Sequence, residues 1–444
     1  MIVVFSILII QPLDSRISRE FLITSATTFI FITLTIEFLF YMLSIISNIT
    51  FRKALRRVLS TAASISLTVS CLMSSSEAMA CTSAIIGAEA SASGRPLLWK
   101  HRDTSTTDNK IEYVPASIDG GYAYVALFNA KDRNLSEAWI GMNEMGFAVM
   151  NTASYNLKDD NVPAKNMDKE GFVMTIALKT CRTVDDFEEL LSTLPRPMGV
   201  EANFGVIDAL GNGAFFETNN HSFTKFDLKD SPNHALIRTN YSHSGRKGKG
   251  YGYVREANAE HLLKDAIEEG NVSSEMLTEV VSRSFYHDVR GEDALESNSR
   301  WAVDEDFIPR YKSTATIVIE GIKPLRDIDD ATPGIIIPQY IMWTGLGYPP
   351  VTDIYPVWCH QKGIEEGLRG IGPNGTSPIG NESKKRLGEV FPPRKGGNTK
   401  YIDLLTLKND NGTGYLQILP PRNHDTYVTI SHKRDNGEIT FSDN

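Results

Sequence analysis

The amino-acid composition of this chain changes at residue 80, and that change decides which residues can form a folded domain. Phe21 to Ile46 form a nearly unbroken apolar run, long enough to span a bilayer, for which about 20 residues suffice. Four basic residues between Arg52 and Arg57, an apolar stretch from Val58 to Met73 and the small residues of Ala78-Met79-Ala80 then follow. This second unit has the layout of a secretory signal peptide with its cleavage site. The folded protein must therefore come from the residues after it.

The sequence predicts three segments. Residues 1–50 are an apolar extension, either upstream of a true start near Met42 or a membrane anchor. Residues 51–80 are the signal peptide, and residues 81–444 are a single domain. The cut would fall just before Cys81, which predicts a periplasmic or extracellular protein that meets a membrane only through the N-terminal segment if that is retained.

Composition narrows the class of protein. The hydrophobic fraction of 41% and charged fraction of 22% are those of an ordinary globular chain. The net charge of −9 gives no basic footprint for nucleic acid. A small-molecule substrate is therefore expected, and a homo-oligomer remains open.

The hydrophobic pattern predicts a mixed fold. Short β-rich runs between turn residues predict strands at 82–87, 97–99, 122–129, 138–141, 147–150, 204–208, 213–217, 235–239, 314–320, 334–338, 341–345 and 354–357. Helical periodicity predicts helices at 173–180, 184–192, 256–269 and 274–284, with Thr183 as an N-cap. Residues 369–397 are expected to be surface loop around one short helix, and 426–430 with 438–441 a closing hairpin. Antiparallel blocks separated by paired helices indicate an α+β fold of layered sheets with helices outside.

The cysteine count singles out one residue. Cys71 would be lost with the signal peptide, which leaves Cys81, Cys181 and Cys359. An odd number of cysteines in an exported protein indicates a free and reactive thiol. Cys181 and Cys359 follow apolar runs and are interpreted as small buried side chains. Cys81 is the thiol with an unusual position.

A cysteine at a chain terminus carries two useful groups. Its thiol has an ordinary pKa of about 8.5 and its α-amine one of about 7.7–8.0. The amine is therefore substantially neutral near pH 7 and can accept the thiol proton, so that no separate histidine base is needed. This chemistry requires the peptide bond before Cys81 to be broken.

The residues around this cysteine resemble a known family. Cys81-Thr82-Ser83, followed by Leu98 to Asp103 (LWKHRD), is similar to the start of the N-terminal-nucleophile cysteine hydrolases. These include the choloylglycine hydrolases, the acyl-CoA:6-aminopenicillanate acyltransferases and the acid ceramidase-like amidases. In their R-N-x-D pattern, Lys100 takes the position of the arginine and Asp103 that of the aspartate. Lysine cannot give arginine's planar bidentate grip, and Arg102 is the neighbouring alternative.

The resemblance extends over most of residues 81–358. Gly141 to Phe147 (GMNEMGF) is similar to the family's G-M-N-E-x-G-L segment, and Asn151 follows it. Arg238-Thr239-Asn240 resembles the family's T-N strand end, and Met342 to Trp358 looks most like the acyltransferase branch. A later family arginine has Arg255 as its nearest candidate.

The resemblance implies a four-layer αββα sandwich and the hydrolysis of linear amide C–N bonds, such as those of N-acyl amino acids or conjugated bile salts. Cys81 would attack the amide and its amine would shuttle the proton. Asp103 would orient the amine, Asn151 and Asn240 would donate to the oxyanion, and Lys100 or Arg102 would lower the thiol pKa or hold a substrate carboxylate.

Two alternatives stay open. An amine arriving in place of water would make the protein an acyltransferase. Ala78-Met79-Ala80-Cys81 also resembles a loose lipobox, and lipidation of Cys81 would give a lipid-anchored binding protein without activity. The sequence holds no H-E-x-x-H and no paired C-x-x-C, so no metal or other cofactor is expected.

Overall fold

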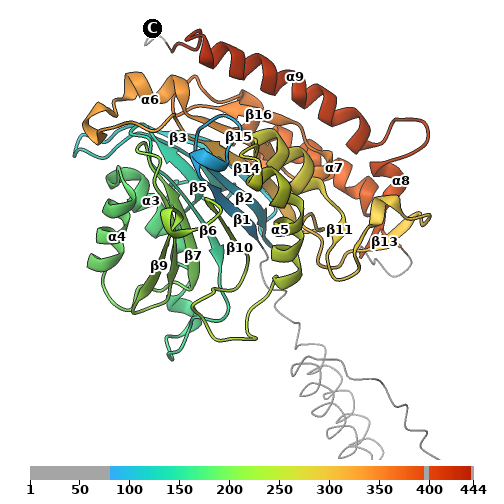
Figure 1. Cartoon of the computed structure of the whole chain (residues 1–444), viewed down its shortest axis with the longest axis horizontal. Coiled ribbons are helices and arrows are strands. Elements are labelled where there is room, and N and C mark those ends of the chain that lie inside the picture. The colour runs from blue at the N-terminus through green and yellow to red at the C-terminus, as the bar shows by residue number, and fades with distance from the viewer. Residues whose placement is uncertain (1–80, 395–399, 442–444) are drawn as a thin grey trace, which may run out of the picture. The chain divides into compact units, whose positions relative to one another are not determined.

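Two antiparallel sheets form the centre of the fold in the computed structural model, which describes residues 81–394 and 400–441 (Figure 1). The predicted signal peptide and apolar extension lie outside the described residues. In the described ranges no helix is both long enough and apolar enough to cross a membrane.

The first sheet has six strands. Their order is β10 (Ala235–Arg238), β1 (Thr82–Ile86), β2 (Leu97–Asp103), β14 (Ser313–Glu320), β15 (Ile341–Leu346) and β16 (Ile354–Val357). All neighbours pair antiparallel. Strand β1 therefore lies inside the sheet, between β10 and β2, which gives the start of the folded chain a fixed position.

The second sheet has seven strands in sequence order. They are β3 (Asn109–Val114), β4 (Tyr124–Asn129), β5 (Ala138–Asn143), β6 (Ala148–Ala153), β7 (Ala202–Ile207), β8 (Gly213–Thr218) and β9 (Phe223–Asp227). Each pairs antiparallel with the next. The predicted Gly-Asn-Gly turn joins β7 to β8.

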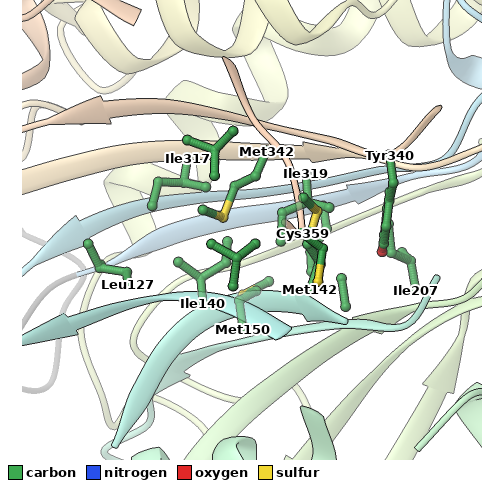
Figure 2. Close-up of a cluster of buried hydrophobic side chains, with 14 of the residues drawn as sticks. Leu127, Ile140, Met142, Met150, Ile207, Ile317, Ile319, Tyr340, Met342 and Cys359 are labelled. Atoms are coloured by element: carbon green, nitrogen blue, oxygen red, sulfur yellow. The ribbon is translucent and has the colours of Figure 1, made fainter. Parts of the chain in front are cut away.

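The two sheets pack face to face. Side chains of both sheets meet in one buried cluster, with Leu127, Ile140 and Met142 on one side and Ile317 and Met342 on the other (Figure 2). Because successive side chains of a strand point to opposite faces, each sheet has a second face to cover.

Helices cover both outer faces. Helices α3 (Glu170–Thr180) and α4 (Val184–Thr193) pack on the seven-stranded sheet. Helices α5 (Tyr253–Glu268) and α9 (Tyr415–Asp435) pack on the six-stranded sheet (Figure 1). The predicted α+β fold with four αββα layers is confirmed. Thr183 is the N-cap of α4, where its hydroxyl accepts from the Asp186 backbone N–H.

Smaller elements complete the fold. They are α6 (Pro333–Gln339), α7 (Pro378–Val390), α8 (Leu404–Leu407), the pair β11 (Tyr286–His287) with β12 (Glu292–Asp293), and the pair β13 (Trp301–Val303) with β17 (Tyr401–Asp403).

Two sequence predictions were wrong. Of the expected closing hairpin, residues 426–430 lie in the long helix α9 and residues 438–441 form no strand, and the strand expected at 334–338 is helix α6. Strands β3 and β9 and the short strands β11, β12, β13 and β17 were not predicted. In α6, Pro333 stands in the first turn, where its missing N–H costs nothing, and the β-branched residues after it imitate the composition of a strand. In α9 the β-branched run 426–430 likewise has the composition of a strand. Its residues Tyr427 and Ile430, three positions apart, instead pack on the six-stranded sheet as one face of a helix.

Candidate active site

Cys81 stands immediately before β1, and its side chain faces the space between the sheets. Ile85, four residues further along the strand, points into the core between the sheets, and alternation puts Cys81 on the same face. The Cys81 Sγ donates to the Asp103 backbone carbonyl at 3.7 Å. The side chain is 6% exposed, so it is reached through a cavity rather than from open solvent.

That cavity has a volume of about 590 Å³. Five of the residues selected from the sequence line it together: Cys81, Lys100, Arg102, Asp103 and Asn151. The structure therefore brings together the residue immediately before β1 with residues of β2 and β6.

Lys100 is buried beside Cys81. Its Nζ donates to the Trp139 carbonyl at 2.7 Å and to the Asn151 Oδ1 at 2.8 Å. Burial, with a smaller contribution from Arg102, lowers the pKa of Lys100 from 10.5 to about 7, while Cys81 acts in the opposite direction. Lys100 can therefore exchange a proton near neutral pH.

Arg102 lies on the same face of β2, two residues further on. Its guanidinium donates to the Asn109 Oδ1 at 2.7 Å and the Asn129 Oδ1 at 3.0 Å, and it lies over the Trp139 ring. Burial lowers its pKa to about 10. Its strong hydrogen bonds thus go to neutral oxygens, so a second positive charge faces the cavity.

Asn151 is oriented by Lys100. Since an ammonium group only donates, the oxygen of the Asn151 amide must face Lys100, and its nitrogen must face the other way. Within the described residues that nitrogen has no hydrogen-bond partner, and Asn151 lines the cavity. Asn151 therefore supplies a neutral N–H donor within the cavity that Cys81 also lines.

The Asp103 carboxylate is held on the opposite face of β2. Ser313 Oγ donates to its Oδ1 at 2.6 Å, and Arg310 Nε donates to its Oδ2 at 3.1 Å. The side chain is almost completely buried. Its backbone carbonyl is the group that Cys81 contacts, so Asp103 lies next to the point where the chain enters β1.

Arg255 ties Cys81 to Asn240. From helix α5 its Nη1 donates to the Cys81 carbonyl at 2.6 Å and to Thr82 Oγ1 at 3.0 Å, and its Nη2 donates to the Asn240 Oδ1 at 2.9 Å. Asn240 in turn donates to the Ala153 carbonyl at 2.8 Å. Asn240 is fully buried and is not among the residues that line the cavity. Arg255 thus contacts the backbone of Cys81, although its match to the family pattern was the weakest of the candidates.

Sequence reasoning missed four residues of the site. Arg310 and Ser313 hold Asp103, Trp139 packs against both cations, and Glu170 lines the cavity. None belongs to a motif, and Ser313 meets Asp103 only through the register of β14 against β2. Burial raises the pKa of Glu170 to about 7, so the cavity holds a second group that titrates near neutral pH.

The other described thiols lie elsewhere. Cys181 packs under α3 and α4, and Cys359 lies between the sheets (Figure 2). Burial raises the pKa of Cys181 to about 12 and also raises that of Cys359. Among residues 81–394 and 400–441, Cys81 is therefore the thiol that chemistry can reach.

A larger hollow of about 760 Å³ lies between β9, β10 and helix α5. It holds none of the residues selected from the sequence. The Ala235 carbonyl at its edge accepts from Ser231 Oγ, and the Ile237 carbonyl accepts from Arg238 Nη1. These side chains occupy backbone acceptors of β10, which protects this edge of the sheet.

No family model matches the chain, and no curated protein matches it. Solved structures do resemble it. A Caenorhabditis elegans ortholog of N-acylethanolamine-hydrolyzing acid amidase has 13% identity and a TM-score of 0.34, covering 57% of this chain and 97% of its own. A mutant of the conjugated bile acid hydrolase from Clostridium perfringens has 13% identity and a TM-score of 0.37, covering 63% and 92%.

A third similar structure is the penicillin V acylase from Agrobacterium tumefaciens. It has 11% identity and a TM-score of 0.32, and the match covers 63% of this chain and 86% of that protein. With TM-scores below 0.5 the three structures are likenesses only, and the fold stands on this chain's own sheets and helices.

Proposed function

We propose that this protein is an exported hydrolase of linear amide C–N bonds, with Cys81 as the N-terminal nucleophile of the mature chain. The observation that supports it most is the placement of Cys81. It follows an Ala-Met-Ala sequence that fits a signal-peptide cleavage site, it stands immediately before β1, and it lines a cavity that also contains two buried cations and an amide donor.

In the first half of the reaction, the α-amine of Cys81 takes the thiol proton and Sγ attacks the substrate carbonyl. The S–C bond forms while the carbonyl electron pair moves to oxygen, and the Asn151 N–H stabilises that oxyanion. The oxyanion then collapses, the C–N bond breaks, and the leaving nitrogen takes the proton from the α-ammonium group. A thioester on Cys81 remains.

In the second half, water attacks the thioester and gives its proton to the α-amine. Collapse of the second oxyanion breaks the C–S bond, releases the carboxylic acid and returns the proton to the thiolate. Asp103 stabilises the ammonium form of the amine in both halves. Lys100 and Arg102 favour the thiolate, because positive charges beside a thiol favour its ionised form. Asn240 stays a prediction as the second oxyanion donor.

The test compares the wild-type protein with variants that lack the thiol of Cys81 or of Cys181. The mature protein is incubated with N-acyl amino acids, conjugated bile salts and dipeptides, and release of free amine is measured. Wild type is expected to release amine and to carry a transient acyl mass on the peptide that begins with Cys81, whereas Cys81→Ala does neither. Cys181→Ser is the matched control and should retain activity, because this thiol is buried away from the cavity. Equal turnover by Cys81→Ala would refute the proposal, and a diacylglyceryl mass on Cys81 would indicate a lipid-anchored protein instead.

A further inference from the structure

Behind Cys81, on the face of β2 opposite Lys100 and Arg102, the side chains of His101 and Asp103 form a buried chain of contacts with Ser313. His101 Nε2 lies 2.8 Å from Ser313 Oγ, and Ser313 Oγ lies 2.6 Å from Asp103 Oδ1. His101 is 0% exposed and Ser313 is 3% exposed. Neither residue has a role in the mechanism given above.

The contacts around Ser313 fix the direction of its proton. The Arg310 backbone N–H donates to Ser313 Oγ at 2.9 Å. The Asp103 carboxylate can only accept, so the serine proton goes to Asp103. With that proton used, His101 must donate its Nε2–H to Ser313. The hydroxyl is then saturated, with two hydrogen bonds accepted and one donated.

In the neutral imidazole this assignment leaves Nδ1 unprotonated. Among the described residues Nδ1 has no hydrogen-bond partner, although it is buried. Burial lowers the pKa of His101 to about 4, with the nearby Arg255 and Arg310 acting in the same direction and Asp103 in the opposite one. His101 therefore keeps its donor role at every pH at which the protein would work.

We infer that His101 and Ser313 are positioning residues that hold the Asp103 carboxylate in place for the α-amine of Cys81. This inference rests on the proposed function, since the amine exists only after processing. Arg310 anchors Oδ2 and Ser313 anchors Oδ1, so the carboxylate cannot rotate, and each oxygen keeps a lone pair for a further donor. Asp103 lies beside Cys81, as the contact of its backbone carbonyl with Sγ shows.

The same three residue types occur in serine hydrolases, but this geometry does not support a second nucleophile. In such a triad the histidine accepts the serine proton and the aspartate orients the histidine. Here the serine proton goes to the aspartate instead. Ser313 also does not line the cavity, so no substrate reaches it.

Most of the other titratable groups around Asp103 are basic. Arg310 forms an ion pair with it, and His101 Nε2 lies 3.5 Å from its Oδ1. The further groups that interact with it electrostatically are Arg102, Arg255 and Tyr348. Loss of the Ser313 hydrogen bond would leave the Arg310 contact to hold the carboxylate by one oxygen only.

The test measures how fast iodoacetamide alkylates Cys81 in the mature protein as a function of pH, which requires no knowledge of the substrate. A well-placed Asp103 stabilises the ammonium form of the amine, and the neighbouring ammonium stabilises the thiolate. In Ser313→Ala and in His101→Met this support is weakened. We expect alkylation at pH 6.5 to slow about tenfold, equivalent to one pKa unit, with the midpoint shifted to higher pH. Cys81→Ala provides the blank for the other thiols.

His101→Gln is the matched rescue variant, because its amide N–H can replace the Nε2 donor of the imidazole. It should restore the wild-type pH profile, whereas a merely structural role would make both histidine variants alike. The histidine pair keeps the test valid if Ser313→Ala fails to fold. Wild-type profiles in processed Ser313→Ala and His101→Met would overturn the inference. Residues still attached ahead of Cys81 in active wild-type protein would instead overturn the proposed function.

Discussion

Lys100 and Arg102 are buried cations whose hydrogen bonds go to neutral oxygens. Neither forms an ion pair with any described residue. Taking a charge out of water costs free energy that an ion pair would partly return. The burial of Lys100 and Arg102 in one cavity therefore lowers the stability of the protein, and it places two positive charges beside Cys81.

Replacement of Lys100 should make this cost visible. Lys100→Met removes the buried cation and should raise the free energy of unfolding at pH 6 by about 1–4 kcal/mol. The folded pKa of about 7 lies below the ordinary 10.5, so the unfolded state binds more protons between these values and wild-type stability rises with pH there. The advantage of Lys100→Met should thus shrink from pH 7 to pH 10. Urea unfolding at pH 6 and pH 9 measures both values, and a gap independent of pH would contradict the burial argument.

Asn151 offers a kinetic test of the cavity. Asn151→Ala removes the donor beside Cys81 and should lower kcat about 10²- to 10³-fold with little change in KM, because the oxyanion exists only in the transition state and intermediate. Asn219→Ala, in the turn after β8, is the control and should leave kcat unchanged. An unchanged kcat in Asn151→Ala would remove this residue from the mechanism.

Among individual residues, the sequence predicted only the site residues that belong to recognisable motifs. Cys81, Lys100 and Arg102 lie together as the motif implied. Ser313 and Arg310 could not be found, because each is an ordinary residue more than 200 positions from Asp103. Their contact depends on strand register, which no local pattern of residues specifies.

Among the elements, helix α5 has the most direct link to the site. Arg255 near its start is fully buried and donates to acceptors on Cys81, Thr82 and Asn240. Burial lowers its pKa to about 10, so it remains charged in the working range. The helix is therefore fastened to the first strand at the point where the mature chain would begin.

Arg255→Met should loosen this attachment. Three buried acceptors lose a charged donor, and we expect the free energy of unfolding to fall by about 3 kcal/mol or more, together with a loss of activity. Lys264→Met, an exposed position on the same helix, should change stability by no more than about 0.5 kcal/mol. Thermal unfolding of the two variants side by side measures the difference. Equal behaviour would mean that Arg255 does not hold the helix.

Helix α9 illustrates where local pattern fails. The run from Thr426 to Ile430 is rich in β-branched and aromatic residues and favours a strand when taken alone. In the structure Tyr427 is buried, with its ring 4.2 Å from that of Trp343 and its hydroxyl 2.7 Å from Thr278 Oγ1, while Val428 is exposed. Packing against the outer face of the six-stranded sheet makes this segment helical. That face is formed by residues far from α9 in the sequence, so the local pattern could not predict it.

Neighbouring substitutions test this helix. Tyr427→Ala should destabilise the protein by about 3–5 kcal/mol, as is usual when a large buried aromatic side chain is removed. Val428→Ala should cost no more than about 0.5 kcal/mol. Urea unfolding distinguishes the two, and comparable losses at both positions would contradict the packing of α9.

On the scale of the whole molecule, the layered fold was predictable because its strands alternate with turns and its helices come in pairs. Strand β9 was not predicted, because its residues are mostly half-buried and show no clear alternation of apolar and polar side chains. The candidate site is assembled from distant parts of the chain: the residue before β1 is the proposed nucleophile, β2 supplies the cations, β6 the amide side chain and β14 the anchor of Asp103. All of them converge on the point where the chain enters its first strand.

The central claim is that this point is the true N-terminus of the working enzyme. The most direct measurement is the mass of the N-terminal peptide of purified, catalytically active protein. The account predicts a peptide that begins with Cys81 and carries a free amine. Full activity in protein that retains even one residue ahead of Cys81 would contradict it.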